Sequence, residues 1–221
     1  MKWNVNRQLV SKIDQRHTKS YIRDDGRFGF RVNCYLTFKC SLDCHYCTNK
    51  YLDGVTPCSD EMDLTGWMKA IEGFQLPIMH VYITGGEPTL HPDFSDIVNS
   101  LLGRGYSITL MSNLTNGKMG ELIKDGAKEN STLPSGKQRF RILATRHVGY
   151  SSTMFKDRLE ELRDYPIYPL EFEEEQLLDV SHSLSVMDKD KCLNEVKFCI
   201  GPDGKFFTSK RDLLENYAGP S

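Results

Sequence analysis

The sequence carries three cysteines within eight residues, Cys40, Cys44 and Cys47, in the pattern C-x3-C-x2-C. They follow a β-branched and aromatic run that predicts a strand, Val32 to Phe38. Thiolates are the ligands that suit zinc and iron–sulfur clusters best, so this loop predicts a metal centre. A structural zinc site is closed by four ligands, whereas three ligands leave one metal position open for chemistry. The count of three therefore favours a reactive centre.

A zinc site is the alternative interpretation of this loop. Its fourth ligand would have to be His45, Cys34 or Cys58. His45 stands between two of the cysteines, Cys34 lies on the predicted strand, and Cys58 follows a Gly/Pro loop. None of them gives the paired C-x2-C spacing of a zinc ribbon. We therefore favour an iron–sulfur cluster and expect Cys34 and Cys58 to be packed thiols.

A second motif, Gly85-Gly86-Glu87-Pro88, follows another apolar run, Val81 to Thr84. Paired glycines allow backbone angles and close approaches that side chains would forbid, so a ligand can lie against the main chain. Pro88 fixes the turn that follows. The alternative is a plain strand-to-helix turn that binds nothing.

The two motifs together resemble the signature of the radical S-adenosylmethionine (radical SAM) enzymes, in which an aromatic residue, here Tyr46, precedes the last cysteine. The resemblance extends from about Asn33 to Asn116. It implies a [4Fe–4S] cluster with one open iron, held by Cys40, Cys44 and Cys47. It also implies that the amino group of SAM is held at the second motif, by Gly85, Gly86 and Glu87, with Pro88 and Tyr46 beside the cofactor.

The resemblance gives Ser112 and Asn113, which follow the predicted strand 107–111, a role at the ribose hydroxyls of SAM. Asn offers both a donor and an acceptor for this, although an ordinary polar loop is the alternative. The implied reaction is the one-electron cleavage of SAM to methionine and a 5′-deoxyadenosyl radical, which takes a hydrogen atom from a substrate. An electron donor such as flavodoxin or ferredoxin is an implied partner, and the protein is expected to be oxygen-sensitive.

Alternating strand and helix patterns must position these motifs. They predict an α/β fold with a parallel sheet, in which the site lies at the C-terminal ends of the strands. The chain is too short for a full eight-fold barrel of ~250 residues, so we expect an incomplete (β/α)6 barrel with a short C-terminal β-hairpin. The expected strands are 32–38, 78–84, 107–111, 139–145 and 166–172, the last broken by Pro169. The expected helices are 63–72, 93–102, 119–124 and 151–164, with Asp63 or Thr65 as the N-cap candidate of the first and Asp93 as that of the second.

Three regions follow from these patterns: an N-terminal extension at 1–31, the partial barrel at 32–190 and a hairpin and tail at 191–221. Arg146 and His147, after the fourth strand, are pocket candidates that could meet an anion or move a proton. The hairpin turns at residues 202–204 and resembles the start of an extension that carries auxiliary clusters. Cys192 and Cys199 alone cannot supply such a cluster, so we expect the hairpin without it.

The composition of the chain excludes few classes of function. A net charge of −2 and a pI near 6.3 give no sign of a nucleic-acid partner. No stretch approaches the ~20 apolar residues that span a bilayer, and the first residues lack the apolar core of a signal peptide, so we expect a cytoplasmic protein.

The substrate is expected to be a small molecule such as a nucleotide or sugar. The alternatives are a peptide- or protein-modifying radical SAM enzyme, a zinc-stabilised binding module, and a relative that binds SAM without cleaving it.

Overall fold

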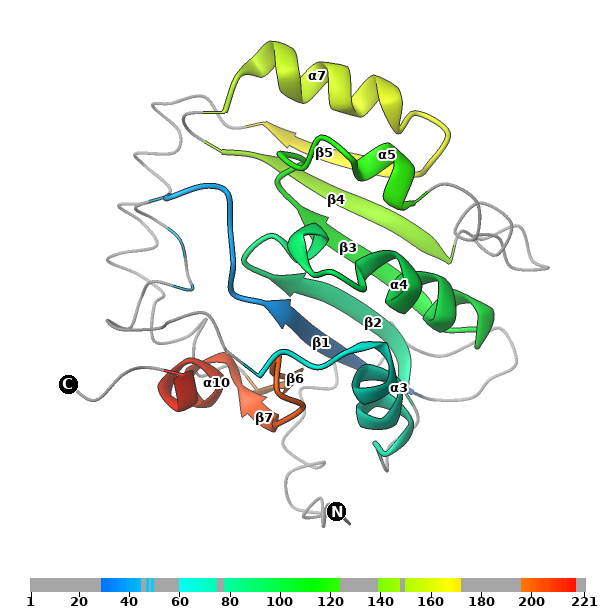
Figure 1. The fold of residues 1–221 in the computed structure, drawn as a ribbon, viewed down its shortest axis with the longest axis vertical. Coiled ribbons are helices and arrows are strands. Elements are labelled where there is room, and N and C mark those ends of the chain that lie inside the picture. Colours follow the sequence, from blue (N-terminus) through cyan, green and yellow to red (C-terminus); the bar gives the residue numbers. More distant parts are fainter. Residues whose placement is uncertain are drawn as a thin grey trace.

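The computed structural model describes residues 29–44, 47, 49, 60–74, 78–123, 139–147, 150–171 and 196–217. Within these ranges the chain forms one seven-stranded sheet in the order β5-β4-β3-β2-β1-β6-β7 (Figure 1). The strands are β1 (Phe30–Thr37), β2 (Ile78–Gly85), β3 (Ser107–Ser112), β4 (Phe140–Arg146), β5 (Ile167–Glu171), β6 (Val196–Ile200) and β7 (Phe206–Ser209). Every neighbouring pair is parallel except β6 and β7.

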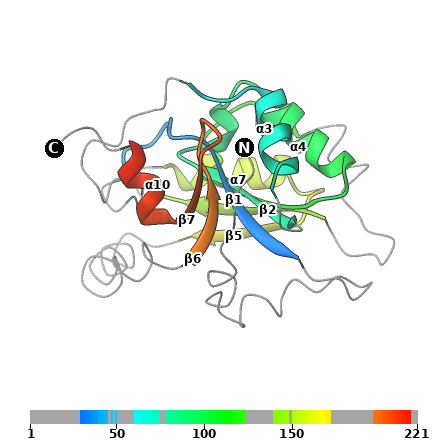
Figure 2. The same ribbon diagram turned by 90° about the horizontal axis from the view of Figure 1, so that it is seen from below.

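Within the described ranges, the helices between the parallel strands pack on one face of the sheet. They are α3 (Leu64–Glu72), α4 (Phe94–Gly103), α5 (Met119–Leu122) and α7 (Ser152–Glu161), and the short 3-10 helix η3 (Pro88–Leu90) follows β2. Figure 2 shows α3 and α4 on their side of the sheet. Their buried residues, such as Trp67 and Phe94, pack in a single core with Val81, Ile83 and Leu110. The other residues of each strand alternate to the opposite face, which we call the inner face.

The expected α/β fold, an incomplete barrel with a C-terminal hairpin, is confirmed: in the described ranges β1 to β5 lie side by side in chain order, and β7 turns back on β6. The sixth parallel strand is β6 of the hairpin itself, and it pairs with β1. The predicted break at Pro169 is wrong, because β5 pairs with β4 on both sides of it, with Ala144 opposite Pro169. Proline removes one donor from a ladder, and an edge strand such as β5 tolerates that loss. None of the helices in the described ranges is long and apolar enough to cross a membrane.

Two aspartates fix the start of α3. Asp63 is its N-cap as predicted, since its side chain accepts a hydrogen bond from the Gly66 N–H at 2.8 Å. Asp93 occupies the N-cap position of α4 but makes no side-chain bond to that helix. Its Oδ2 instead accepts from the Leu64 N–H at 2.9 Å, so it satisfies a free donor at the first turn of α3. The two helices are thereby tied together at the end of the sheet that carries the motifs.

The C-terminal hairpin extends the sheet beyond β1, because β6 pairs with β1 in parallel. A helix that the sequence patterns did not predict, α10 (Lys210–Tyr217), follows β7. Its Leu213 and Leu214 pack with Tyr35 and Cys199, which belong to the inner face. Helix α10 therefore covers the β1–β6 side of that face. The division of the chain at 1–31, 32–190 and 191–221 stays a prediction.

Candidate functional site

The loop that carries the three cysteines, residues 38–49, is called the cysteine loop below. It leaves the C-terminal end of β1 and is attached to the C-terminal end of β2, on the left-hand side of the sheet in Figure 1. The Gly86 N–H donates to the Thr37 carbonyl at 2.8 Å, and the Glu87 N–H donates to the Lys39 carbonyl at 2.8 Å. From within the loop, Asn49 Nδ2 donates to the Gly85 carbonyl at 2.6 Å. These bonds place the thiols directly beside the Gly85–Pro88 turn.

The glycines of that turn are required by this attachment. Gly85 has φ +139°, a conformation that L side chains rarely adopt, and a Cβ there would lie 2.1 Å from the Thr37 carbonyl oxygen. A Cβ on Gly86 would lie 2.2 Å from the Lys39 carbonyl oxygen. Both obstacles are backbone atoms, one at the end of β1 and one in the cysteine loop, so neither can move aside as a flexible side chain would. The two motifs therefore contact each other main chain to main chain.

Glu87 joins the end of β2 to the end of β3 inside the protein. Its carboxylate is fully buried and accepts hydrogen bonds from the Thr89 hydroxyl at 2.7 Å, the Ser112 hydroxyl at 2.9 Å and the Asn113 N–H at 2.8 Å. Burial raises the pKa of this carboxyl, and the hydrogen bonds oppose that rise. The carboxylate thus faces protein donors. The predicted contact of the Gly85–Glu87 segment with the SAM amino group stays a prediction, and the groups left to make it are those of its main chain.

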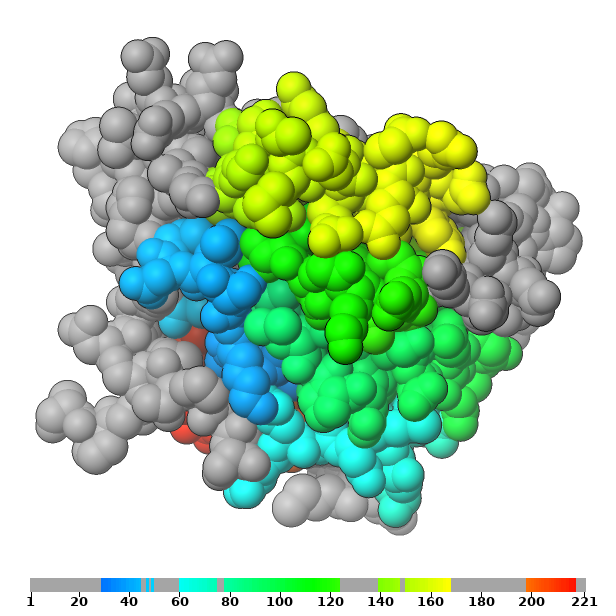
Figure 3. Space-filling model, turned by 45° about the horizontal axis from the view of Figure 1, so that its top comes forward, coloured from blue at the N-terminus to red at the C-terminus, as the bar shows by residue number. Residues whose placement is uncertain are grey.

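Ser112 and Asn113 differ in the hydrogen-bond partners of their side chains. The Ser112 hydroxyl is buried and donates to Glu87, whereas Asn113 Nδ2 reaches the Cys40 Sγ at 3.6 Å. Asn113 Oδ1 accepts from the N–H and the hydroxyl of Thr115, and Ser41 shares a hydrogen bond with the same Thr115 hydroxyl. In Figure 3 the blue cysteine loop accordingly lies at the surface against green segments. Between these two residues, only Asn113 connects β3 to a thiol.

None of the three thiols is in a disulfide: Cys40 is exposed, and Cys44 and Cys47 are half-buried. The pKa of the Cys40 thiol is raised, first by loss of hydration at the sulfur and further by the nearby Glu87 and Cys47. The described residues include no set of three Cys, His, Asp or Glu side chains close enough to hold a metal ion. The three cysteines thus share one loop at the sheet edge without converging on one point.

Comparisons with known proteins decide the family. The model of the Radical SAM superfamily matches residues 34–170, which include the second half of β1, the cysteine loop, the Gly85–Pro88 turn and strands β2 to β4. The chain belongs to the radical SAM superfamily of enzymes. The resemblance carried by the two motifs is therefore confirmed.

The curated relatives match this chain over less than half of its length. A PqqA peptide cyclase from Methylorubrum populi is 37% identical over 91 residues, which make up 40% of this chain and 22% of that protein. An S-adenosylmethionine-dependent nucleotide dehydratase from Selenomonas ruminantium is 28% identical over 86 residues, or 38% of this chain and 30% of that protein. The matched stretch spans less than a third of either relative.

A solved structure agrees with the fold. The structure of BtrN in complex with AdoMet and 2-DOIA has a TM-score of 0.56 and 14% identity, and the match covers 86% of this chain and 75% of that one. At this identity the likeness concerns the fold alone.

The residues present fit the iron–sulfur cluster that the radical SAM superfamily implies. Three thiols that form no disulfide lie on one loop, and the number leaves one cluster iron without a protein ligand. A zinc site with Cys34 as fourth ligand is disfavoured, since Cys34 is buried in the core and burial, with nearby Cys199, raises its thiol pKa. Tyr46, His45, Cys58 and Cys192 lie outside the described residues.

The pocket candidates of the fourth strand lie at its end, as expected. Arg146 is the last residue of β4, and its Nη1 donates to the Tyr150 carbonyl at 3.4 Å, so at least part of its guanidinium is engaged by the protein. His147 is half-buried, and burial lowers its pKa. Their roles toward SAM or substrate stay predictions.

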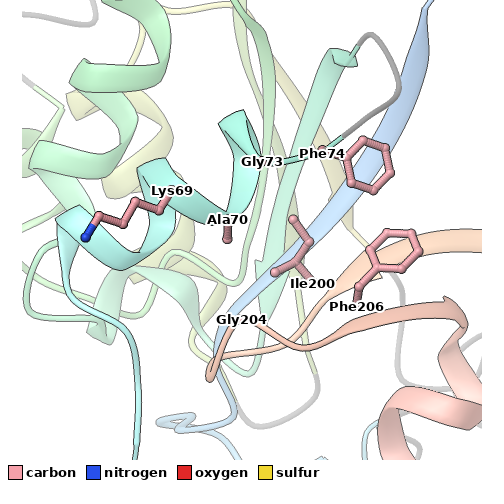
Figure 4. A pocket seen from close by; sticks show the side chains of 7 residues that line it. All are labelled: Lys69, Ala70, Gly73, Phe74, Ile200, Gly204 and Phe206. Atoms are coloured by element: carbon pink, nitrogen blue, oxygen red, sulfur yellow. The ribbon is translucent and has the colours of Figure 1, made fainter. Parts of the chain in front are cut away.

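A small hollow of about 150 Å³ lies elsewhere, between α3 and the hairpin (Figure 4). It is lined by Lys69, Phe74 and Phe206 among others. None of its lining residues belongs to the cysteine loop, to the Gly85–Pro88 turn or to Ser112–Asn113. It is therefore not the radical SAM site.

The sequence patterns missed one polar group on the inner face of this radical SAM sheet. We call it the inner polar layer, and it consists of Arg31, His80, Tyr82, Thr109 and Arg141. The register brings these residues together from four neighbouring strands, because Arg31 pairs with His80, Tyr82 with Thr109, and Thr109 with Arg141. A signal was present: polar residues alternate with apolar ones along each of these strands, and we interpreted only the apolar ones.

Proposed function

We propose that this chain binds a [4Fe–4S] cluster through Cys40, Cys44 and Cys47 and uses it to cleave S-adenosylmethionine reductively. When bound, the cluster supplies the electron for that cleavage, and the 5′-deoxyadenosyl radical so formed removes a hydrogen atom from the substrate. The hard chemistry belongs to the cofactors, so the protein contributes binding, orientation and exclusion of water. A protein electron donor such as flavodoxin or ferredoxin would feed the cluster.

One observation carries this proposal: the ends of β1, β2 and β3 are linked to one another at one edge of the sheet. The cysteine loop is bonded to the Gly85–Glu87 segment, the Glu87 carboxylate is bonded to Ser112 and Asn113, and Asn113 Nδ2 reaches the Cys40 Sγ at 3.6 Å. Ligands in parallel α/β folds bind at this edge. A plain zinc-stabilised module would not need a closed connection between thiols, paired glycines and a third strand.

The main-chain segment Gly85–Glu87 and the Asn113 side chain are the groups that would bind and orient SAM. The amino group of the methionine part donates hydrogen bonds, so carbonyl groups of this segment would hold it. The Gly85 carbonyl already accepts from Asn49 Nδ2, and the Gly86 and Glu87 N–H groups donate to Thr37 and Lys39. Asn113 keeps its amide next to Cys40 and is the better candidate for a ribose contact than Ser112, whose hydroxyl is engaged by Glu87.

The test is made on protein reconstituted anaerobically with iron and sulfide, then mixed with SAM and a strong reductant. We expect about four irons per chain, a [4Fe–4S] spectrum, and 5′-deoxyadenosine detected by chromatography and mass. Cys44→Ala should lose both iron and product. Cys34→Ala is the matched control, because Cys34 is a packed thiol of the core, and it should keep both.

Three results would overturn parts of the proposal. Iron content and product unchanged in Cys44→Ala would refute the cysteine assignment. One zinc per chain in place of iron would support the zinc-stabilised module. A complete cluster without 5′-deoxyadenosine, even with candidate substrates present, would indicate a relative that binds SAM without cleaving it.

The substrate class is the open part of the proposal. One relative is named for a peptide and another for a nucleotide, and each shares less than half of this chain. We favour a small-molecule substrate such as a nucleotide or sugar over a peptide, and the inner polar layer supports that choice.

A further inference from the structure

The inner polar layer is a cationic group in the middle of the sheet. Arg141 Nε donates to the Thr109 hydroxyl at 2.7 Å, and its Nη2 donates to the Tyr82 hydroxyl at 3.4 Å. The Arg31 guanidinium lies 4.5 Å from the centre of the Tyr82 ring. The His80 Nε2 is 2.8 Å from the Thr109 hydroxyl. Two guanidinium groups are thus gathered around one tyrosine and one threonine.

The charge of Arg141 is not matched by a described carboxylate. Both of its hydrogen-bond acceptors above are neutral hydroxyls, and within the described residues no carboxylate pairs with it. Burial first, and then Arg141 and Arg31, lower the pKa of His80 to about 3, so its imidazole is neutral at physiological pH. A half-buried guanidinium held only by neutral groups is a site that favours an anion.

Part of the layer is accessible. Arg31, His80, Tyr82 and Arg141 each keep part of their surface exposed, whereas Thr109 is buried. Further along the same face, next to the C-terminal residue of β3, Met111 is 37% exposed. The inner face is therefore reachable between the layer and the ends of the strands.

The distance between the inner polar layer and the C-terminal ends of the strands sets the length that the substrate must span. Arg141 lies three residues before Ala144, which pairs with Ser112 at the end of β3. At a rise of ~3.3 Å per residue, an anion at Arg141 would be about 10 Å from the edge that carries the thiols. A molecule the size of a nucleotide or a sugar phosphate spans that distance.

We propose that the inner polar layer binds an oxyanion group, phosphoryl or carboxylate, of the small-molecule substrate, and that it holds the rest of that molecule toward the thiol-bearing edge. This inference rests on the proposed function. Arg141 supplies a forked donor, Arg31 adds charge, and the neutral His80 and the Tyr82 and Thr109 hydroxyls can turn toward the oxygens.

The experiment measures binding of inorganic phosphate, and in parallel acetate, to the reconstituted full chain by calorimetry, with chloride at the same ionic strength as the reference. We expect phosphate to bind above the chloride background. Arg141→Gln should weaken that binding by about 10- to 100-fold, the size of a lost charged hydrogen bond. Arg104→Gln is the matched control, since it also removes one positive charge but from an exposed pair with Glu72, and it should bind as the wild type does.

Phosphate binding without acetate binding would identify a phosphoryl source, and binding of both would support either oxyanion. No binding above chloride, equal binding by Arg141→Gln and the wild type, or equal weakening by Arg104→Gln would each overturn the inference. If circular dichroism shows that Arg141→Gln does not fold, Arg31→Gln decides by the same comparison.

Failure of this inference is distinguishable from failure of the proposed function. Phosphate binding is measured without SAM or reductant, whereas 5′-deoxyadenosine formation is measured without phosphate. Product without phosphate binding refutes the anion site alone. Phosphate binding without product, when candidate substrates are present as well, refutes SAM cleavage alone.

Discussion

Replacing Glu87 with glutamine should destabilise the fold, although the two side chains have nearly the same shape. The carboxylate accepts two main-chain N–H groups on different oxygens: Thr89 N–H donates to Oε1 at 3.2 Å, and Asn113 N–H donates to Oε2 at 2.8 Å. Glutamine has one oxygen, so one of these buried N–H groups would face an NH2 group. The Ser112 and Thr89 hydroxyls can rotate and accept from that group, but a main-chain N–H cannot.

The cost follows from that single unsatisfied donor. A buried donor left without an acceptor costs about 1–3 kcal/mol, and total stabilities are about 5–15 kcal/mol, so Glu87→Gln should fold with a measurable loss. Glu87→Ala would lose every acceptor and leave a cavity as well, so we expect it to lose more. The glutamine variant is therefore the more informative of the two.

The assay is urea unfolding followed by circular dichroism and tryptophan fluorescence. Trp67 in α3 is fully buried and reports the packing of the core. The matched control is Glu72→Gln, because the Glu72 side chain is 52% exposed and its ion pair with Arg104 lies at the surface. This control should change the free energy of unfolding by less than about 1 kcal/mol. A Glu87→Gln protein as stable as the control would show that the carboxylate does not hold β2 to β3.

Two further changes test the site and the inner face. Gly86→Ala would place a Cβ 2.2 Å from the Lys39 carbonyl oxygen and should displace the cysteine loop. We expect this variant to lose about 1–3 kcal/mol of stability and to retain less iron after reconstitution. Gly103→Ala is the control: nothing lies within 4 Å of its Cβ, so stability and iron content should stay as in the wild type. The pKa of His80 is lowered from 6.5 to about 3, so below pH 6.5 the unfolded chain binds a proton that the folded chain does not, and stability falls as pH falls. Relative to His80→Gln, the wild type should lose on the order of 2 kcal/mol more between pH 6.5 and 4.5 in urea unfolding, and parallel pH profiles would contradict this.

The sequence predicted the elements whose signals are local. Asp63 caps α3 because a carboxylate three residues before an N–H can bond within one turn, and apolar periodicity located the helices that pack on the sheet. The two motifs were found because each is a short run with chemistry of its own. Their common location at one edge followed from the parallel topology alone.

The sequence could not predict contacts that depend on strand pairing. Nothing within β4 indicates that Arg141 lies beside Thr109 and Tyr82, because that depends on the register of three strands. Asp93 follows the same rule: it precedes α4 in sequence, yet its carboxylate bonds to the start of α3 in space. Helix α10 was overlooked because only its tertiary packing distinguishes it from a polar tail.

The paired glycines have a second role that the sequence alone did not indicate. In the sequence they indicate room for a ligand. In the structure they also make room for the backbone at the end of β1 and in the cysteine loop, where the Thr37 and Lys39 carbonyls accept from the Gly86 and Glu87 N–H groups. The same segment then continues through the Glu87 carboxylate to Asn113, which returns to Cys40. The thiols, the glycines and the third strand thus form a closed set of contacts, and none can shift without the others. Cluster retention and SAM binding should for this reason respond together to a change at any one of them.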